Sequence, residues 1–211
     1  CPPTFGVAPD RVICLMAGGP AALRQSVEGA EDDTDRGRAD MAAVQPGARD
    51  LVAGISASGR TPYVLAALEC AAAAGAATVL LACNPEVAAG ADLVIALDTG
   101  AEVLAGSTRL KAGTATKLVL NMLSTGAMVL SGHVYGPCMV GMRPVNAKLR
   151  ARALRMVSAL GGVDYEAAGQ YLDAADGTIP VAVLMASRGM SRVEAEAALR
   201  AAGGVLRRAL R

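Results

Sequence analysis

The segment from Leu51 to Pro62 constrains the fold more than any other part of the chain. An apolar strand, Leu51–Ile55, stops at a turn of small residues and hydroxyls, and a helix begins at once with Pro62 in its first turn. The pattern of apolar strand and helix recurs, with further strands expected at Arg11–Ala17, Thr78–Cys83 and Asp92–Leu97. Because near-continuously apolar strands that alternate with helices are typical of parallel sheets covered on both faces, the sequence predicts an α/β fold.

The helical segments change in character along the chain. Between the strands we expect helices at Pro20–Val27, Asp32–Ala43 and Pro62–Ala74, and after them a long helix at Thr114–Leu130. From about Asn146 the pattern becomes all helical, with glycine-containing turns between Lys148–Leu160, Tyr165–Ala174, Pro180–Ser187 and Arg192–Ala201. The sequence therefore predicts an α/β domain over residues 1–147 and a small helical domain over residues 148–211.

The turn after the Leu51 strand has the chemistry of an anion site. It offers hydroxyls at Ser56, Ser58 and Thr61, backbone N–H groups and the positive end of a helix dipole. The alternative is an ordinary strand-to-helix turn with a Ser/Thr cap. Since three hydroxyls converge on one helix start, we favour a site for a phosphate monoester, and we expect Asn84 and Lys111 at the same carboxyl edge of the sheet.

A second polar cluster, residues 106–117, precedes the long helix. It combines small residues and hydroxyls, among them Ser107 and Thr108, with cations that include Arg109 and Lys111. The spacing differs from that of a Walker A loop. On the residues alone, each hydroxyl could equally cap the helix and each cation could be a surface charge, while Glu102, a few residues upstream, is placed to orient one of the cations.

Four carboxylates lie between Glu28 and Asp33, where the helix Asp32–Ala43 is predicted to begin. One interpretation is a solvated acidic turn that complements the helix dipole. The other is that one carboxylate points into the sugar-phosphate site as a general acid or base. The spacing alone does not select which acid.

Composition excludes several classes of partner. The 20 basic and 19 acidic side chains are mixed along the chain and only 2% of residues are aromatic, so nucleic acid is not expected as a partner. No uninterrupted run of about 18 apolar residues is present, so no membrane-spanning helix is expected. Five scattered cysteines without a C-x-x-C pair, and a single histidine, His133, indicate neither a metal site nor a disulfide framework, and we expect a reduced, cytoplasmic setting.

Several motifs together make the chain similar to a known family. They are Gly54–Tyr63, Ala82–Pro85, Glu102–Ala115, Lys117–Gly126 and Asn146–Leu149. They resemble N-acetylmuramic acid 6-phosphate etherases of the sugar isomerase domain superfamily, to which glucokinase regulatory protein is related. The resemblance covers essentially the whole chain. It implies a three-layer α/β/α sugar isomerase domain followed by a ubiquitin-associated-like helical domain, and a homodimer with sites near the subunit interface.

The resemblance also implies an activity. A member of this family cleaves the D-lactyl ether of N-acetylmuramic acid 6-phosphate with water, giving N-acetylglucosamine 6-phosphate and D-lactate, without a metal or redox cofactor. Matching the family motif places one of two catalytic glutamates at Glu31, as the base at C2, with Glu28 as the alternative. The substrate, a small phosphorylated amino sugar, would contact the residues Ser56, Ser58, Arg60, Thr61, Asn84, Ser107 and Lys111.

The beginning of the chain differs from the family pattern. The chain starts at Cys1 rather than at Met, and the family's second glutamate belongs immediately before the Cys-Pro-Pro-Thr motif that begins at Cys1. We therefore expect an N-terminally truncated sugar isomerase domain, without that acid and without the family's first phosphate loop.

Two other functions share part of the pattern. A non-catalytic sugar-phosphate sensor, like glucokinase regulatory protein, would keep the phosphate loop but would be expected to carry a second sugar isomerase domain. An aldose–ketose phosphate isomerase would share the phosphate loop but should lack the Glu31 motif and the C-terminal helices. The sequence therefore favours the etherase-type lyase over both.

Overall fold

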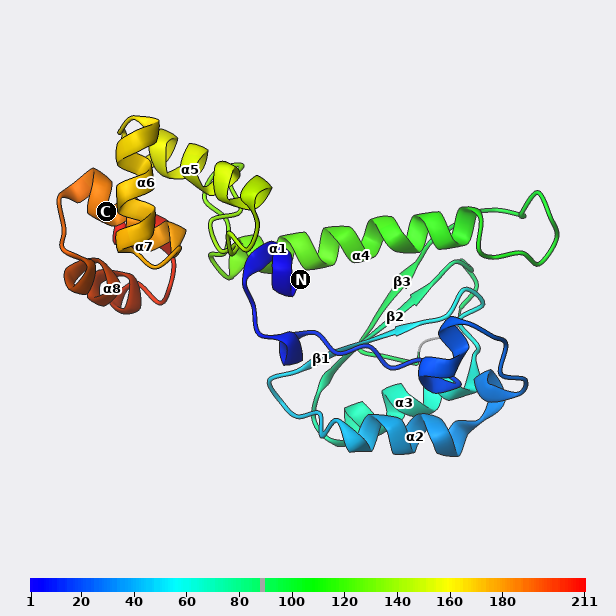
Figure 1. Cartoon of the computed structure of the whole chain (residues 1–211). Coiled ribbons are helices and arrows are strands. Elements are labelled where there is room, and N and C mark those ends of the chain that lie inside the picture. Colours follow the sequence, from blue (N-terminus) through cyan, green and yellow to red (C-terminus); the bar gives the residue numbers. More distant parts are fainter. Residues whose placement is uncertain (88–89) are drawn as a thin grey trace. The chain divides into compact units, whose positions relative to one another are not determined.

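The computed structural model of the protein describes residues 1–87 and 90–211 (Figure 1). These residues divide into two compact units, one formed by residues 14–121 and the other by residues 1–13 and 122–211. Each unit has its own cluster of buried apolar side chains. The predicted domain boundary at residue 148 stays a prediction.

A parallel sheet forms the centre of the unit of residues 14–121. Its strands are β1 (Leu51–Ile55), β2 (Ala77–Ala82) and β3 (Leu93–Ala96), in the order β1-β2-β3. Leu51 lies opposite Ala77, and Ala82 lies opposite Ala96. The three strands confirm the prediction of an α/β fold with a parallel sheet, and their carboxyl ends share one edge.

Two helices lie on the same side of this sheet (Figure 1): α3 (Pro62–Ala73) packs against β1 and β2, and α2 (Thr34–Ala43) packs against α3. Small residues make the close packing possible. A Cβ atom added to Gly54 in β1 would lie 2.6 Å from Leu68 Cδ1, and one added to Gly37 in α2 would lie 2.4 Å from the Tyr63 carbonyl oxygen. Gly54 therefore lets β1 approach the Leu68 side chain of α3, and Gly37 lets α2 approach the backbone of α3.

Tyr63 also links α2 and α3 through its hydroxyl. The ring is buried, and the hydroxyl donates to Asp40 Oδ2 over 2.8 Å. Asp40 in turn forms an ion pair with Arg36, at 2.8 Å. Burial and the hydrogen bond to Asp40 raise the pKa of Tyr63 to about 12.

Two sequence predictions near the beginning of the chain are wrong. Arg11–Ala17 forms no strand: a 3₁₀ turn, η1 (Pro9–Arg11), is followed by irregular backbone. Apolar composition alone does not make a strand without a neighbour that satisfies the backbone N–H and C=O groups. The helix predicted at Pro20–Val27 is only a 3₁₀ turn, η2 (Gly19–Leu23), because Leu23 is exposed and packing stabilises no longer helix.

After β3 the described residues form helices that are joined by turns and irregular segments. Six follow the sheet: α4 (Lys111–Leu130), α5 (Ala147–Gly161), α6 (Tyr165–Ala174), α7 (Ile179–Arg188), α8 (Arg192–Ala201) and the short α9 (Leu206–Ala209). They confirm the predicted helical region, although α9 was not expected. α7 is the most buried of them and packs against α5, α6 and α8. Among the described residues, no helix has both the length and the apolar character needed to cross a bilayer.

Side-chain caps define where several of these helices begin. Asn146 accepts a hydrogen bond from the Leu149 N–H at the start of α5, and Asp164 accepts one from the Ala167 N–H at the start of α6. Ser191 and Glu194 form a reciprocal capping box at the start of α8. Such caps satisfy N–H groups that have no partner inside the helix, which explains why these starts could be predicted within one residue.

Candidate functional site

The loop after β1 gathers three hydroxyls around one buried oxygen. Ser56 is only 4% exposed, and its Oγ lies 2.7 Å from Thr61 Oγ1 and 3.3 Å from Ser58 Oγ. The Ser56 oxygen also accepts the Gly59 N–H over 3.1 Å. Ser58 Oγ accepts the Arg60 N–H over 3.2 Å. The structure thus brings Ser56, Ser58 and Thr61 together, and Ser56 organises the other two.

Gly59 gives this loop its shape. Its φ of +72° lies in the left-handed region that favours glycine, and the residue is buried. A Cβ at this position would lie 2.2 Å from Val87 Cγ2 and 3.2 Å from Ala82 Cβ. The loop therefore depends on glycine for its backbone conformation and for its close approach to the segment after β2.

The start of α3 is open to an anion. Thr61 is the N-cap residue, and Pro62, the first helical residue, has no N–H. The first backbone bond of the helix is donated by Leu65 to the Thr61 carbonyl. Within residues 1–87 and 90–211, no side chain caps this helix and no hydrogen bond uses the N–H groups of Tyr63 and Val64. These N–H groups and the helix dipole suit a negatively charged ligand.

The loop after β2 forms hydrogen bonds with residues 56–61, which we call the hydroxyl loop. The Cys83 N–H donates to the Ala57 carbonyl over 2.9 Å, and Asn84 Nδ2 donates to the Ser58 carbonyl over 3.3 Å. Asn84 Oδ1 accepts the Glu86 N–H over 3.0 Å. Asn84 therefore lies next to the hydroxyl loop, as the sequence predicts. Its amide nitrogen and its amide oxygen each form a hydrogen bond with a backbone group.

The start of α4 is closed by a carboxylate. Glu102 lies in the loop after β3, where its Oε2 accepts the Lys111 N–H and its Oε1 accepts the Ala112 N–H, each over 3.0 Å. The next N–H groups are also satisfied, because Gly113 donates to the Thr108 carbonyl and Thr114 to the Leu110 carbonyl. The hydrogen bonds from the backbone of Ala112 and Lys111 lower the pKa of Glu102.

Cys83 connects the loop after β1 to the start of α4. Its Sγ lies 3.5 Å from the Ala112 carbonyl oxygen and 3.6 Å from Thr116 Oγ1, both in the first turns of α4. Its N–H contacts Ala57 in the hydroxyl loop. The open start of α3 and the capped start of α4 thus both adjoin the carboxyl edge of the sheet, and the loop after β2 contacts α4 and the loop that leads into α3.

The remaining predicted residues surround this centre less tightly. Arg60 is exposed, so its guanidinium is free to move toward a ligand. Lys111 is exposed, and its Nζ lies 3.5 Å from where a Cβ on Gly100 would be, beside the loop after β3. Ser107 uses its carbonyl to accept the Leu110 N–H, as part of the turn that leads into α4.

The acidic segment divides into residues with different surroundings. Asp33 caps α2 by accepting the Arg36 N–H over 2.8 Å, and Glu28 accepts the Ser26 hydroxyl over 2.6 Å. Glu31 lies on the short 3₁₀ helix η3 (Ala30–Asp32), which packs against α3, and its side chain is exposed. The interpretation as an acidic helix start therefore holds for Asp33, while Glu31 keeps an accessible carboxylate.

Sequence reasoning missed two structural roles at this edge. It placed Glu102 only as an orienter of a cation, although the carboxylate caps α4 through two backbone N–H groups. It gave Cys83 no role at the site, although the thiol joins the loop after β2 to the first turns of α4. A glutamate that precedes a helix by about nine residues leaves no local signal, since common caps lie within three residues of the helix start.

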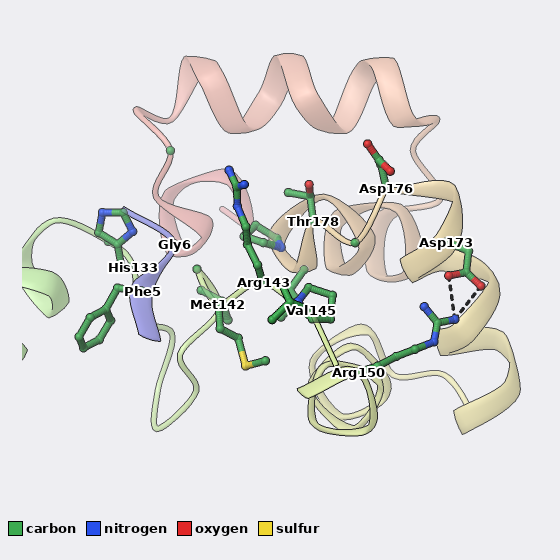
Figure 2. Close-up of a pocket in the computed structure, with 18 residues that line it drawn as sticks. Phe5, Gly6, His133, Met142, Arg143, Val145, Arg150, Asp173, Asp176 and Thr178 are labelled. Atoms are coloured by element: carbon green, nitrogen blue, oxygen red, sulfur yellow. Dashed lines mark hydrogen bonds and ion pairs between the residues drawn. The ribbon is translucent and has the colours of Figure 1, made fainter. Parts of the chain in front are cut away.

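A separate cleft lies in the unit of residues 1–13 and 122–211 (Figure 2). Its volume is about 730 Å³, and the side chains along it include Phe5, His133, Met142 and Arg143. At one end Arg150 forms an ion pair with Asp173 at 2.8 Å (Figure 2). None of the predicted site residues lines this cleft, and the described part of the chain holds no cluster of three metal-ligating side chains.

Comparisons with known proteins found one family model and several similar proteins. The family model for the glucokinase regulatory protein N-terminal SIS domain matches residues 5–72. Over its full length the chain is 50% identical to N-acetylmuramic acid 6-phosphate etherase of Mycolicibacterium smegmatis and covers 71% of that protein. It is likewise 48% identical to the etherase of Rhizobium rhizogenes, covering 69% of it, and 49% identical to that of Halalkalibacterium halodurans, covering 71%.

Proposed function

Because the chain belongs to the N-acetylmuramic acid 6-phosphate etherase family, we propose that its site binds N-acetylmuramic acid 6-phosphate and releases D-lactate from it. The reaction is a carbon–oxygen lyase reaction followed by addition of water. The single observation that carries the proposal is the convergence of three hydroxyls on the uncapped start of α3. A phosphate monoester is the part of this substrate that such a site fits.

The 6-phosphate would bind at the loop after β1. Ser58 already accepts a backbone N–H and is exposed, so its O–H is available to donate to a phosphate oxygen. Thr61 and the N–H groups of Tyr63 and Val64 would supply the other donors. Ser56 would hold the Thr61 and Ser58 hydroxyls in place. Arg60, from the rim of the loop, would add a positive charge.

The sugar would extend from the phosphate across the carboxyl edge of the sheet. In that position Asn84, Ser107 and Lys111 would be the contacts for its polar groups. The support is topological: Asn84 donates to the hydroxyl loop, and Ser107 and Lys111 lead into the helix that Cys83 joins to that loop. This arrangement agrees with the rule that ligands of open α/β sheets bind beyond the carboxyl ends of the strands.

Glu31 would be the base. In the open-chain sugar the aldehyde at C1 acidifies the proton at C2, and a carboxylate removes it. The C3–O bond then breaks, the departing lactate oxygen takes up a proton, and a C2–C3 double bond conjugated to the aldehyde remains. Water adds its oxygen to C3 and gives up one proton, which replaces the proton taken up by lactate, while Glu31 returns its proton to C2. Glu31 is exposed on a turn that packs against α3, and this supports the assignment over Glu28, whose carboxylate holds Ser26.

The broader organisation is proposed on the same basis. We infer a sugar isomerase domain over residues 1–147 in a three-layer arrangement, a ubiquitin-associated-like helical domain over residues 148–211, and a homodimer. The five cysteines are all free thiols in the structure, which supports a reduced, cytoplasmic setting.

A regulatory function is the second candidate, because the family model that matches residues 5–72 is that of a regulatory protein. One experiment separates the two functions. The protein encoded by the complete gene is incubated with N-acetylmuramic acid 6-phosphate, and D-lactate is measured with a lactate dehydrogenase. Catalytic release of D-lactate supports the lyase, whereas tight binding of the sugar phosphate without release supports the sensor.

A further inference from the structure

Two helix starts adjoin the carboxyl edge of the sheet, and they differ in one respect. The start of α3 has N–H groups that no described residue uses, whereas every N–H of the first turn of α4 has an acceptor. In α4 two of these acceptors are the oxygens of one carboxylate, Glu102. The carboxylate has the charge and the paired oxygens of a bound anion, and it occupies the position that an anion would take.

We propose that Glu102 is an orientation-determining residue: it closes the start of α4 to phosphate, so that a sugar phosphate binds with its phosphate at α3 and its sugar at α4. This inference rests on the proposed phosphate site and explains the direction in which the substrate lies across the edge of the sheet. Without Glu102, the same edge of the sheet would offer two helix starts with unpaired N–H groups, both beside the loop after β2. A substrate with a phosphate at one end could then bind in two opposite directions.

The position of Glu102 at the start of α4 is fixed by the elements that surround it. The carboxylate comes from the loop after β3, while the N–H groups belong to α4, so both are placed by the same sheet edge. Cys83 holds the Ala112 carbonyl at 3.5 Å, which keeps the start of α4 beside the hydroxyl loop. Lys111, the first residue of α4, therefore has a carboxylate on its own N–H and an ammonium that extends toward Gly100.

The inference acts on binding, so its test is the number and position of bound phosphates. Inorganic phosphate is titrated into the chain by calorimetry and followed by phosphorus NMR. The wild-type chain should bind one phosphate, and this site should be lost when Ser58 and Thr61 are both replaced by alanine. Glu102→Ala frees the N–H groups of Lys111 and Ala112, so it should bind a second phosphate, and that second site should persist in the Ser58→Ala/Thr61→Ala background.

Two further variants keep the result interpretable. Glu102→Gln removes the charge and leaves one oxygen acceptor for the two N–H groups, so one N–H is free for phosphate. A weaker second site is therefore expected in this variant, even if Glu102→Ala unfolds the start of α4. Glu194→Gln is the matched control, because Glu194 is also a capping glutamate with a lowered pKa, but it lies at the start of α8. Ser191 still caps α8 in that variant, so one phosphate is expected.

The outcomes separate this inference from the proposed function. One phosphate in the wild type and two in Glu102→Ala would support the inference. One phosphate in the wild type and still one in both Glu102 variants would overturn it and leave the α3 site intact. A wild-type chain that binds no phosphate would overturn the proposed α3 site, and the inference with it.

Discussion

Replacing Gly59 with alanine should destabilise the protein and distort the hydroxyl loop. The residue has a φ of +72°, and a left-handed conformation costs a residue with a Cβ about 1–2 kcal/mol. The added Cβ would also lie 2.2 Å from Val87 Cγ2, so the segment after β2 must shift, and such overpacking costs about 1–3 kcal/mol more. The expected loss in the free energy of unfolding is therefore about 2–5 kcal/mol.

Gly75 offers a matched control. It has a φ of +85°, but a Cβ added there meets no atom within 4 Å among the described residues. Gly75→Ala should therefore carry only the conformational cost of about 1–2 kcal/mol. The difference between the two variants isolates the steric clash with Val87.

The assay is urea unfolding of the wild type and both variants, together with phosphate binding by calorimetry. Gly59→Ala should lose stability and bind phosphate more weakly, because Ser58 and the N–H of Arg60 flank the altered residue. Gly75→Ala should bind phosphate like the wild type. If Gly59→Ala costs no more stability than Gly75→Ala and binds phosphate normally, the packing argument for the loop is refuted.

Three other predictions concern the site and its support. Ser58→Ala should weaken binding of the 6-phosphate sugar by about ten- to hundredfold in calorimetry, the effect of losing one hydrogen bond to a charged group; unchanged affinity would mean that the hydroxyl only shapes the loop. Glu31→Gln in the protein from the complete gene should lower D-lactate release at least about a hundredfold while sugar-phosphate binding persists; a variant that keeps most of its activity would reduce Glu31 to a solvated acid. Tyr63 has a raised pKa, so the wild type should lose stability as the pH rises from 10 through about 12, where only the unfolded phenol gives up its proton. Tyr63→Phe should lack that part of the alkaline loss in urea unfolding followed against pH, and an identical pH profile in both proteins would contradict the assignment.

Local patterns predict the elements whose signals are complete within a few residues. Leu51–Ile55 matches β1 at both ends, because an apolar run stops abruptly at Ser56. Tyr165–Ala174 and Arg192–Ala201 match α6 and α8 at both ends, because Asp164 and Ser191 cap them. The hydroxyl cluster was predictable for the same reason: its three side chains lie within six residues of one another.

Features that depend on distant partners could not be predicted in this way. Arg11–Ala17 has the composition of a strand, but a strand also needs a neighbour with which to pair, and the sequence does not show one. The capping of α4 by Glu102 and the bridge made by Cys83 join residues far apart in the chain. Such contacts follow from the placement of β2 and β3 side by side, which local patterns do not specify.

The most direct measurement is a crystal structure of the protein with N-acetylmuramic acid 6-phosphate bound. We expect the phosphate between the Ser58 and Thr61 hydroxyls and the first turn of α3, with the sugar beside Lys111 and C2 facing the Glu31 carboxylate. A phosphate bound at the start of α4 or in the cleft beside Arg143, with the loop after β1 empty, would contradict it.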